Sequence, residues 1–412
     1  PETRGSQVIV HGKVWAPPAP AEYYRRRDEL WGAVEAGYRR LAAVRELVII
    51  EGAGSPAEPN LMARDLTNMA IARLARAPVL LVGDIDRGGV FAALLGTLAL
   101  LPAGDRRRVK GFIINKFRGD PGLLAPAISF LQTRSRRPVL GVVPYLQDLR
   151  LPEEDSVALE GPSPREGRSV AVVRLPHIAN FTDFDPLALE PGTTVRYVHH
   201  PDELAGAGLI LVPGSKDTLA DLRWLRVSGF AEALVRHVEQ GGALGGICGG
   251  YQMLGLRVED PERLEGGGAE DGLGLLPVVT TLAREKITRR VRARLAHGGP
   301  AFEAYEIHLG RTAAPDRLPP FALIEEGGGW RPDGAVSREG RVWGTYLHGL
   351  FDAGSARRAI LERHLGRVLG GTPAPDYREL REQEYDRLAE ALGSTLDLPA
   401  LFALAGLSAG GA

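Results

Sequence analysis

The sequence predicts an α/β protein with two doubly wound domains, each built on a mainly parallel sheet. Short apolar, β-branched segments alternate with helical stretches over residues 1–150, and this alternation restarts after residue 169. Between them, the polar segment 151–169 contains Pro and Gly and is typical of a linker. We therefore expect one domain over residues 1–150 and a second over 170–412.

The first domain is predicted to contain five strands with helices between them. The strands are continuously apolar, as expected for a parallel sheet that is buried on both faces. They are expected at residues 7–10, 46–54, 77–86, 109–116 and 137–144, and the helices at 21–44, 60–76, 89–101 and 120–135.

The second domain repeats this alternation and then changes. Parallel strands are expected at residues 170–176, 193–198, 207–214 and 241–248. Shorter spacings at 273–282, 302–310 and 334–347 predict an antiparallel extension or edge, and residues 355–405 have a helical pattern.

Composition excludes several classes of protein. A net charge of −1 gives no electrostatic reason to expect binding to nucleic acid or to an anionic membrane surface. A single cysteine excludes an internal disulfide framework and a multi-cysteine metal site. No apolar run approaches the ~18 residues that span a bilayer, and no signal peptide is visible, so we expect a cytoplasmic protein.

The single cysteine, Cys248, occurs in "GGALGGICGGYQMLG" (241–255), which has the form of a strand, a glycine-bounded turn and a helix. Glycines permit the positive φ angles and close backbone approach that a nucleophile elbow needs. A thiol at a helix N-terminus also favours the thiolate form. We expect Cys248 to be a nucleophile; a small buried hydrophobic residue is the alternative.

A thiol nucleophile needs a base, and His348 in "RVWGTYLHGLFD" (341–352) is the best of nine histidines because it follows a strand on a Gly-flanked loop. His308 shares a strand face with Glu306. The sequence does not distinguish whether His308 lines a pocket or faces solvent. The backbone N–H of Gly249 is a candidate oxyanion donor. Gly214 or Ser215, in "LILVPGSKDTLADL" (209–222), is a second candidate, unless Ser215 is only a helix N-cap.

With these motifs, residues 170–352 resemble a class I, triad-type glutamine amidotransferase domain. The resemblance implies that Cys248 attacks the glutamine amide, forms a thioester and releases ammonia. The usual His-x-Glu is absent because Gly349 and Leu350 follow His348. We therefore expect the base to work without the standard orienting carboxylate, and with modest efficiency, as in the cobyric and cobyrinic acid amidase branch of the family.

In the first domain, polar residues gather where predicted strands end. Glu51 follows one strand, Asp84, Asp86 and Arg87 follow another, and Asn115-Lys116 end a third. A carboxylate such as Glu51 suits Mg²⁺, and an amide such as Asn115 could read an adenine edge. Taken alone, Glu51 is equally well explained as a solvated loop acid.

This half resembles the dethiobiotin-synthetase-like ATPase domain that is fused to a glutaminase in the cobyric acid synthase family. The resemblance extends over nearly the whole chain, through "ARDLTNMAIA" (63–72), "DIDRGGVFA", "INKFRGD" and "PHIANFTDFDPL" (176–187). It implies that ATP and Mg²⁺ are bound at Glu51, Asp86, Asn115 and Lys116, with Glu51 on the metal. The family's P-loop, G-x-x-x-x-G-K-[ST], is absent and would lie before Pro1. We therefore expect the chain to be incomplete at its N-terminus; the alternative is a protein that does not bind ATP normally.

The reaction implied by the resemblance is ATP-dependent amidation of peripheral carboxylates of (adenosyl)cobyrinic acid a,c-diamide, with L-glutamine as nitrogen donor. The product is (adenosyl)cobyric acid, in cobalamin biosynthesis. Two alternatives remain: the sister activity of cobyrinic acid a,c-diamide synthase or a related polyacid amidase, and a non-catalytic binding or regulatory homologue.

Overall fold

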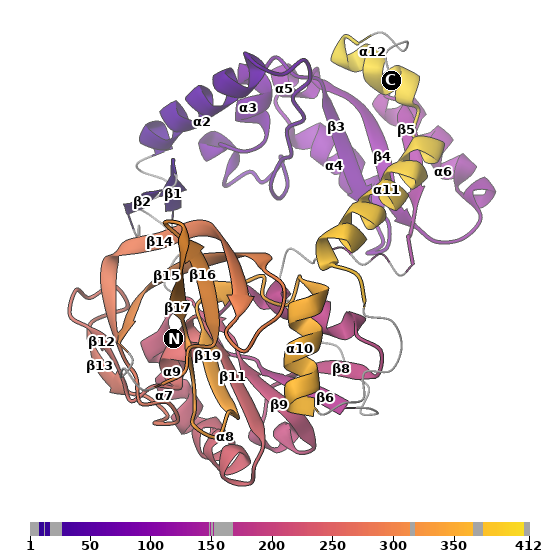
Figure 1. Ribbon diagram of the computed structural model, residues 1–412. Helices are drawn as coiled ribbons and strands as arrows, with labels where there is room; N and C mark the ends of the chain where they lie inside the picture. Colours follow the sequence, from indigo (N-terminus) through magenta and orange to yellow (C-terminus); the bar gives the residue numbers. More distant parts are fainter. Residues whose placement is uncertain are drawn as a thin grey trace. The chain divides into compact units, whose positions relative to one another are not determined.

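The computed structural model describes residues 8–11, 13–16, 27–147, 149, 151, 168–313, 318–365 and 374–407 (Figure 1). The chain divides into two compact units. Unit 1 comprises Pro1–Leu149 together with Tyr385–Ala412, and unit 2 comprises Arg150–Glu384. Most of the linker expected at 151–169 lies outside the described residues, and its last two residues, Arg168 and Ser169, already belong to a strand.

Unit 1 contains a three-stranded parallel sheet in the order β3-β4-β5. Its central strand carries the fully buried Val109, Phe112 and Ile114, and the first two pack with apolar residues of the helices around them. The elements of this unit that precede residue 150 are β1 (Val8–Val10), β2 (Lys13–Ala16), α2 (Arg27–Ala42), η1 (Met62–Arg64), α3 (Met69–Leu74), β3 (Val79–Asp84), α4 (Val90–Leu100), α5 (Ala103–Arg106), β4 (Val109–Phe117), α6 (Pro121–Ser135) and β5 (Val139–Pro144).

Two predicted strands of unit 1 are not strands of this sheet. Residues 46–54 form a loop in which the Ile49 side chain is 87% exposed. Residues Val8–Val10 do form a strand, but it pairs only with β2 in a separate hairpin. A strand needs a neighbouring ladder as well as an apolar pattern, and no described strand pairs with 46–54. Its potential neighbour β3 is an edge strand, with Val82 61% exposed.

The C-terminal helices α11 (Tyr377–Thr395) and α12 (Leu398–Ala405) correct the predicted domain assignment. We expected residues 170–412 to form one domain, but Tyr385–Ala412 belong to unit 1. The Asp397 backbone N–H donates to the Leu140 carbonyl at 2.8 Å, and Leu396 forms a β-bridge with Gly141. A Cβ atom on Gly141 would lie 2.5 Å from Leu396 Cδ2, so this glycine permits the close contact.

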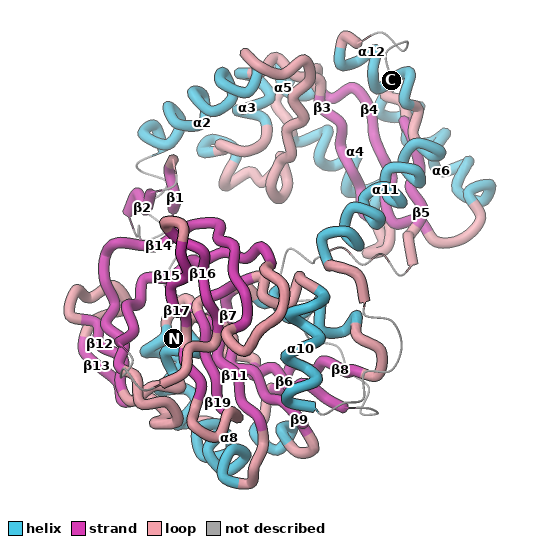
Figure 2. The backbone as a smooth tube through the Cα atoms, in the orientation of Figure 1, coloured by secondary structure: helices cyan, strands magenta, loops and turns pink. Residues whose placement is uncertain are grey.

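Unit 2 is built on a six-stranded sheet whose pairing confirms the predicted parallel alternation. Figure 2 distinguishes the strands of this unit from its helices by colour. All neighbouring strands are parallel except the pair β18-β19. In sheet order the strands are β18 (Ala335–Val336), β19 (Val342–Thr345), β11 (Ala243–Ile247), β9 (Ala207–Val212), β6 (Arg168–Val173) and β8 (Thr193–Val198).

Both faces of this sheet are covered, which explains its continuously apolar strands. Ile210 and Leu244 point to one face, where they pack with apolar residues of α7 (Thr218–Val227), α8 (Phe230–Glu239) and α9 (Gly249–Met253). Leu209 and Leu211 point to the opposite face, towards α10 (Gly354–Leu365) and strands of a second sheet. This two-sided burial is the arrangement expected for a parallel sheet.

The second sheet of unit 2 is mostly antiparallel, as the sequence predicted. Its two longest strands, β14 and β15, pair over most of their length. Its strands are β12 (Arg257–Asp260), β13 (Gly268–Asp271), β14 (Val279–Leu295), β15 (Phe302–Ala313), β16 (Ala322–Glu326), β17 (Gly329–Asp333) and β20 (Leu347–His348). Within the range predicted at 334–347, β18 is the antiparallel edge strand of the parallel sheet, whereas β19 lies inside that sheet and pairs in parallel with β11.

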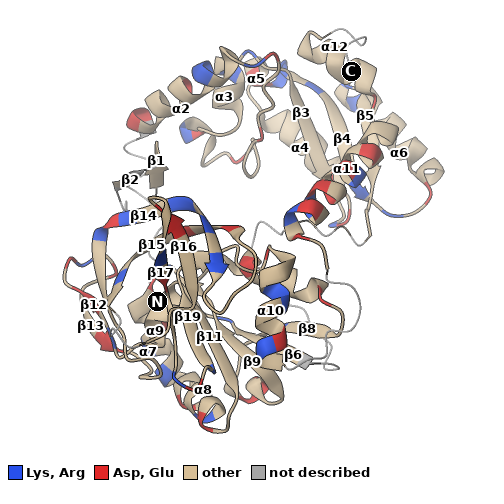
Figure 3. Ribbon diagram, in the orientation of Figure 1, with Lys and Arg blue, Asp and Glu red and all other residues tan. Residues whose placement is uncertain are grey.

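Charged residues are distributed without a dominant sign. Lys and Arg are interspersed with Asp and Glu along the described elements of both units (Figure 3). In the part of the chain that the structure describes, no helix has the length and apolarity to cross a membrane.

A buried ion pair joins α10 to the end of η3 (Phe181–Leu189). Arg357 Nε donates to Glu190 Oε1 at 2.9 Å, and both side chains are fully buried. The remaining Arg357 N–H groups donate to carbonyl oxygens, among them those of Phe351 and Pro375. The pair therefore anchors the segment that, as shown below, supplies residues to the site.

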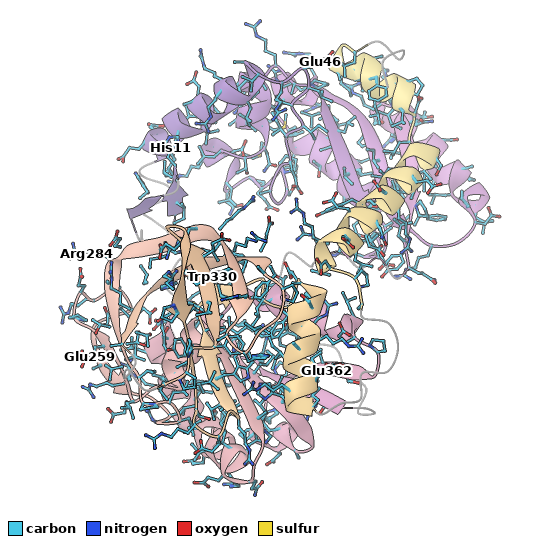
Figure 4. The ribbon with its side chains drawn as sticks, viewed as in Figure 1. His11, Glu46, Glu259, Arg284, Trp330 and Glu362 are labelled. Atoms are coloured by element: carbon cyan, nitrogen blue, oxygen red, sulfur yellow. The ribbon has the colours of Figure 1, made fainter. Side chains whose placement is uncertain are left out.

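We expect Glu190→Ala to lower the free energy of unfolding by about 3–5 kcal/mol, because it leaves the Arg357 charge buried without its carboxylate. Glu362→Ala is the matched control. Glu362 projects from α10 (Figure 4) and pairs with Arg358 at 40% exposure, so its loss should cost no more than about 0.5 kcal/mol. Urea denaturation measures both, and equal effects would contradict the prediction.

Candidate active site

Cys248 lies at the turn between β11 and α9, as predicted. Its backbone has φ 54° and ψ −110°, a conformation that side-chain-bearing residues rarely adopt. Two backbone hydrogen bonds hold the turn: the Cys248 N–H donates to Thr345 O at 2.8 Å, and Cys248 O accepts from the Gln252 N–H at 3.1 Å. Strain of this kind is typical of functional turns.

Glycines allow α9 to lie directly against the ends of the neighbouring strands. A Cβ atom on Gly250 would overlap the carbonyl oxygen of Val212 in β9. A Cβ atom on Gly249 would lie 2.8 Å from the backbone nitrogen of Ser215, and one on Gly246 would lie 2.7 Å from the Gly250 carbonyl. The predicted reason for the glycines, close backbone approach around Cys248, therefore holds at these positions.

His348 lies beside Cys248, as the sequence predicted. It ends β20, is 1% exposed, and comes from a strand that pairs with β15. Gly214 lies against both residues, since a Cβ atom there would be 3.7 Å from Cys248 Cβ and 3.7 Å from His348 Cε1. A Cβ atom at position 214 would thus be in ordinary van der Waals contact with both residues.

Asp183 is the functional residue that the sequence reading missed. His348 Nδ1 is 2.6 Å from Asp183 Oδ2, and the Gly349 backbone N–H donates to Asp183 Oδ1 at 3.1 Å. The expectation that the base lacks an orienting carboxylate was therefore wrong. The carboxylate lies 165 residues earlier in the chain than the histidine, within the segment "PHIANFTDFDPL". The only available signal was that segment itself, which matched the family without indicating a role.

Two further side chains fix the plane of the imidazole. The Tyr305 ring stacks on His348 with centroids 5.2 Å apart and an interplanar angle of 17°. Asn180 Nδ2 donates to the Tyr305 hydroxyl at 2.9 Å and lies 3.2 Å from His348 Nδ1. With Nδ1 engaged in this way, Nε2 is left without a hydrogen-bond partner among the described residues and is available to the thiol.

The electrostatics of the site favour the imidazolium form of His348. Burial by itself lowers the pKa of His348, but the charge and hydrogen bond of Asp183, with a contribution from Cys248, raise the pKa to about 10. A cationic imidazole beside a thiol stabilises the thiolate. The arrangement can therefore generate a sulfur nucleophile and hold a proton next to it.

The predicted oxyanion residues lie against the nucleophile turn. Gly214 and Ser215 form β10, which pairs with β7 (Ile178–Ala179). The Ser215 backbone nitrogen lies close to Gly249, as the glycine contact above shows. Ser215 is not the N-cap of α7, because the Asp217 side chain has that role and accepts from the Ala220 N–H.

His308 is not solvent-facing. It is 7% exposed, stacks on Tyr346 with ring centroids 3.8 Å apart, and lies on the buried face of β15 with Glu306. Glu306 also pairs with Arg289 and Arg331. This polar cluster connects β14, β15 and β17, and among the described residues no contact joins His308 to Cys248.

The structure brings together most of the nucleotide-site candidates in unit 1. Asp84 and Asn115 are paired residues at the ends of β3 and β4. Lys116 Nζ is 3.1 Å from Asp84 Oδ2, and Asp86 forms an ion pair with Arg118 at 2.8 Å. The hydrogen bonds and charges of Lys116 and neighbouring groups outweigh the effect of burial and lower the pKa of Asp84.

No contact joins Glu51 to these residues. Its side chain is exposed and forms no hydrogen bond or ion pair with the described residues. Nor do three or more His, Cys, Asp or Glu side chains converge as a metal site anywhere in the described ranges. A single free carboxylate still fits Mg²⁺, which commonly binds one or two carboxylates together with substrate phosphates and water.

Comparison with known proteins places these features in two families of domains. Residues 169–356 match the CobB/CobQ-like glutamine amidotransferase domain, and residues 12–153 match an AAA domain. The cobyric acid synthase of Sorangium cellulosum is 48% identical, over 98% of this chain and 83% of the relative. Those of Chloroflexus aggregans and Chloroflexus aurantiacus are 49% and 47% identical, over 97% and 95% of this chain and 82% and 80% of the relatives.

The raised pKa of His348 predicts how stability depends on pH in Asp183→Asn. Since the folded-state pKa of about 10 exceeds the usual ~6.5, protonation of His348 stabilises the wild type fully below about pH 6.5, and this contribution disappears as the pH rises through 10. Asp183→Asn should therefore unfold more easily than wild type by more than about 1.4 kcal/mol, the value of one pKa unit, at pH 6.

The difference between variant and wild type should shrink between pH 8 and pH 10. Urea denaturation at pH 6, 8 and 10 measures it. A deficit of constant size across this range would contradict the assignment of the Asp183–His348 interaction as the cause.

Proposed function

Because the chain belongs to the cobyric acid synthase family, we propose that Cys248, His348 and Asp183 release from glutamine the ammonia that this family's amidation consumes. The identity of 47–49% over at least 95% of the chain supports the reaction itself. That reaction is the ATP- and glutamine-dependent amidation of peripheral carboxylates of (adenosyl)cobyrinic acid a,c-diamide to give (adenosyl)cobyric acid, in cobalamin biosynthesis. The observation that carries the residue assignment is the buried His348–Asp183 contact beside Cys248.

In the proposed mechanism the Cys248 sulfur attacks the γ-amide carbon of glutamine. The new S–C bond pushes the carbonyl electrons onto oxygen, and the resulting oxyanion accepts hydrogen bonds from the Gly249 N–H and from the Gly214–Ser215 turn. His348 donates its proton to the leaving nitrogen as the C–N bond breaks, which releases ammonia. Water, deprotonated by His348, then hydrolyses the thioester to glutamate and the free thiol.

Asp183 orients His348 throughout this cycle. Its carboxylate accepts at Nδ1, which fixes the tautomer that presents Nε2 and stabilises the imidazolium. Tyr305 stacks on the face of the same ring, and Asn180 holds Tyr305 by donating to its hydroxyl. The proposed catalytic set is therefore the triad Cys248, His348 and Asp183, whereas we expected from the sequence only Cys248 and His348.

The synthetase half would activate the corrin carboxylate as an acyl phosphate, which ammonia then attacks with loss of phosphate. We assign Asp86, Asn115 and Lys116 to nucleotide binding, because they lie at the carboxyl ends of adjacent parallel strands, where α/β folds place ligands. Glu51 would hold Mg²⁺, which neutralises charge on the phosphates during transfer.

Cys248→Ala should lose glutamine-dependent amidation by at least about 10³-fold while amidation with added ammonium continues, because only the ammonia source is removed. Phosphate release and corrinoid amide formation, measured in the full protein with each nitrogen donor, test this. Both cobyrinic acid and its a,c-diamide are offered as acceptors. Turnover of cobyrinic acid alone would contradict the proposed substrate, and glutamine use by Cys248→Ala would contradict the proposed nucleophile.

Glu51→Gln should raise the Mg²⁺ concentration needed for half-maximal ATP hydrolysis by about tenfold, because a neutral amide is a weaker ligand for a hard cation. Glu58→Gln is the control, since Glu58 is another exposed acid of the same loop. A magnesium titration of ATPase activity in the full protein distinguishes them. An unchanged requirement in Glu51→Gln would remove Glu51 from the metal site.

A further inference from the structure

Another buried carboxylate, Asp221 in α7, connects two segments that surround Cys248. Its side chain is fully buried. Asp221 Oδ2 accepts from Ser215 Oγ at 2.6 Å, and Oδ1 lies 2.8 Å from His177 Nδ1. The His177 backbone N–H also points to Oδ1, at 3.3 Å. Both carboxylate oxygens are therefore engaged, one with each segment.

Each of these segments delivers residues to the active site. The arm His177–Asp183 begins at the Asp221 contact and ends at the carboxylate that orients His348. The turn Pro213–Lys216 carries Gly214, beside Cys248 and His348, and the Ser215 nitrogen, beside Gly249. Apart from Asp221, the two segments are joined by the short β7–β10 pair and by the Lys216 N–H donating to His177 O at 2.8 Å.

The β7–β10 pair has only two residues on each strand, and so short a ladder does not fix a loop by itself. Burying a carboxylate costs free energy, and burial does raise the pKa of Asp221, while hydrogen bonds from Ser215 and His177 oppose that rise. Asp221 touches neither Cys248 nor His348 in any described contact. Its position therefore suits control of geometry, not proton transfer.

We propose that Asp221 is a positioning residue for glutamine hydrolysis: its carboxylate holds the Pro213–Lys216 turn against the His177–Asp183 arm, so that the Ser215 N–H faces the oxyanion formed at Cys248. This inference rests on the proposed function of Cys248. In this inference Asp221 positions the Ser215 oxyanion donor, whereas Asp183 orients the His348 imidazole.

The test compares two reactions of the same thiol. Glutamine hydrolysis passes through an oxyanion, whereas alkylation of Cys248 by iodoacetamide forms an S–C bond with loss of iodide and needs no oxyanion donor. Asp221→Ala should lower kcat for glutamine hydrolysis by about 10²-fold, comparable to the loss of one oxyanion donor, while the alkylation rate stays within about twofold of wild type. A general structural defect would change both rates, with alkylation slower where the contact with His348 is lost and faster where the thiol becomes exposed.

Asp221→Asn keeps the shape of the side chain, an acceptor that can face the His177 backbone N–H and Nδ1, and a donor that can face Ser215 Oγ, so it should recover most of the activity lost in Asp221→Ala. It also serves as the informative variant if Asp221→Ala fails to fold. In that case Asp221→Asn should still lose about threefold or more in hydrolysis, because the charged acceptor is gone, with alkylation unchanged.

Asp217→Ala is the matched control, since Asp217 lies one turn earlier at the start of α7 and caps the helix by accepting from the Ala220 N–H at 3.1 Å. It should lose about 1 kcal/mol of stability with hydrolysis within about twofold of wild type. Wild-type hydrolysis in Asp221→Ala, or in Asp221→Asn where that alone folds, would overturn the inference. Parallel losses in hydrolysis and alkylation would also overturn it.

Cys248→Ala in the same assays separates this inference from the proposed function. If Cys248→Ala still hydrolyses glutamine, the proposed nucleophile is wrong. If Cys248→Ala is inactive and the Asp221 variants behave as wild type, only the role of Asp221 is wrong.

Discussion

The backbone contact between α9 and the ends of β9 and β10 is the constraint on which the glutaminase site depends. Gly250 lies so close to the Val212 carbonyl that no side chain fits, and Gly249 is similarly close to the Ser215 nitrogen. This contact places the strained Cys248 turn and the Gly214–Ser215 turn within one small volume. His348 and Asp183 lie next to a nucleophile whose position this contact already fixes.

A hydrogen-bonded carboxylate at Nδ1 is a requirement of geometry, not of sequence position. In this chain it comes from the His177–Asp183 arm, far from His348 along the sequence. The Gly349 N–H, next to the histidine, binds the second oxygen of Asp183. The arm is itself held by Asp221 at its beginning and by the buried Glu190–Arg357 pair beyond its end. Asp183 is thus positioned by interactions on both sides.

The sequence predicted the features that a local residue pattern determines. It did not predict the features that depend on residues elsewhere in the chain. Cys248, His348 and the Gly214–Ser215 turn could be predicted because each follows an apolar strand. Asp183 could not, because nothing local relates it to His348. Residues 46–54 have a strand pattern but no neighbouring ladder, and the helical pattern of 377–405 carries no information about the unit on which it packs. The nucleotide-site residues remain assigned by strand position and resemblance.

The return of Leu396 and Asp397 to the edge of β5 makes unit 2 an insertion within unit 1. During synthesis, residues 8–147 therefore leave the ribosome before the segment that completes their own unit. The edge of β5 at Gly141 therefore lacks its partner segment until all of unit 2, more than two hundred residues, has been synthesised. Unit 2, whose chain is continuous, can fold first. All residues of the glutaminase unit are thus synthesised before the segment that closes the synthetase fold.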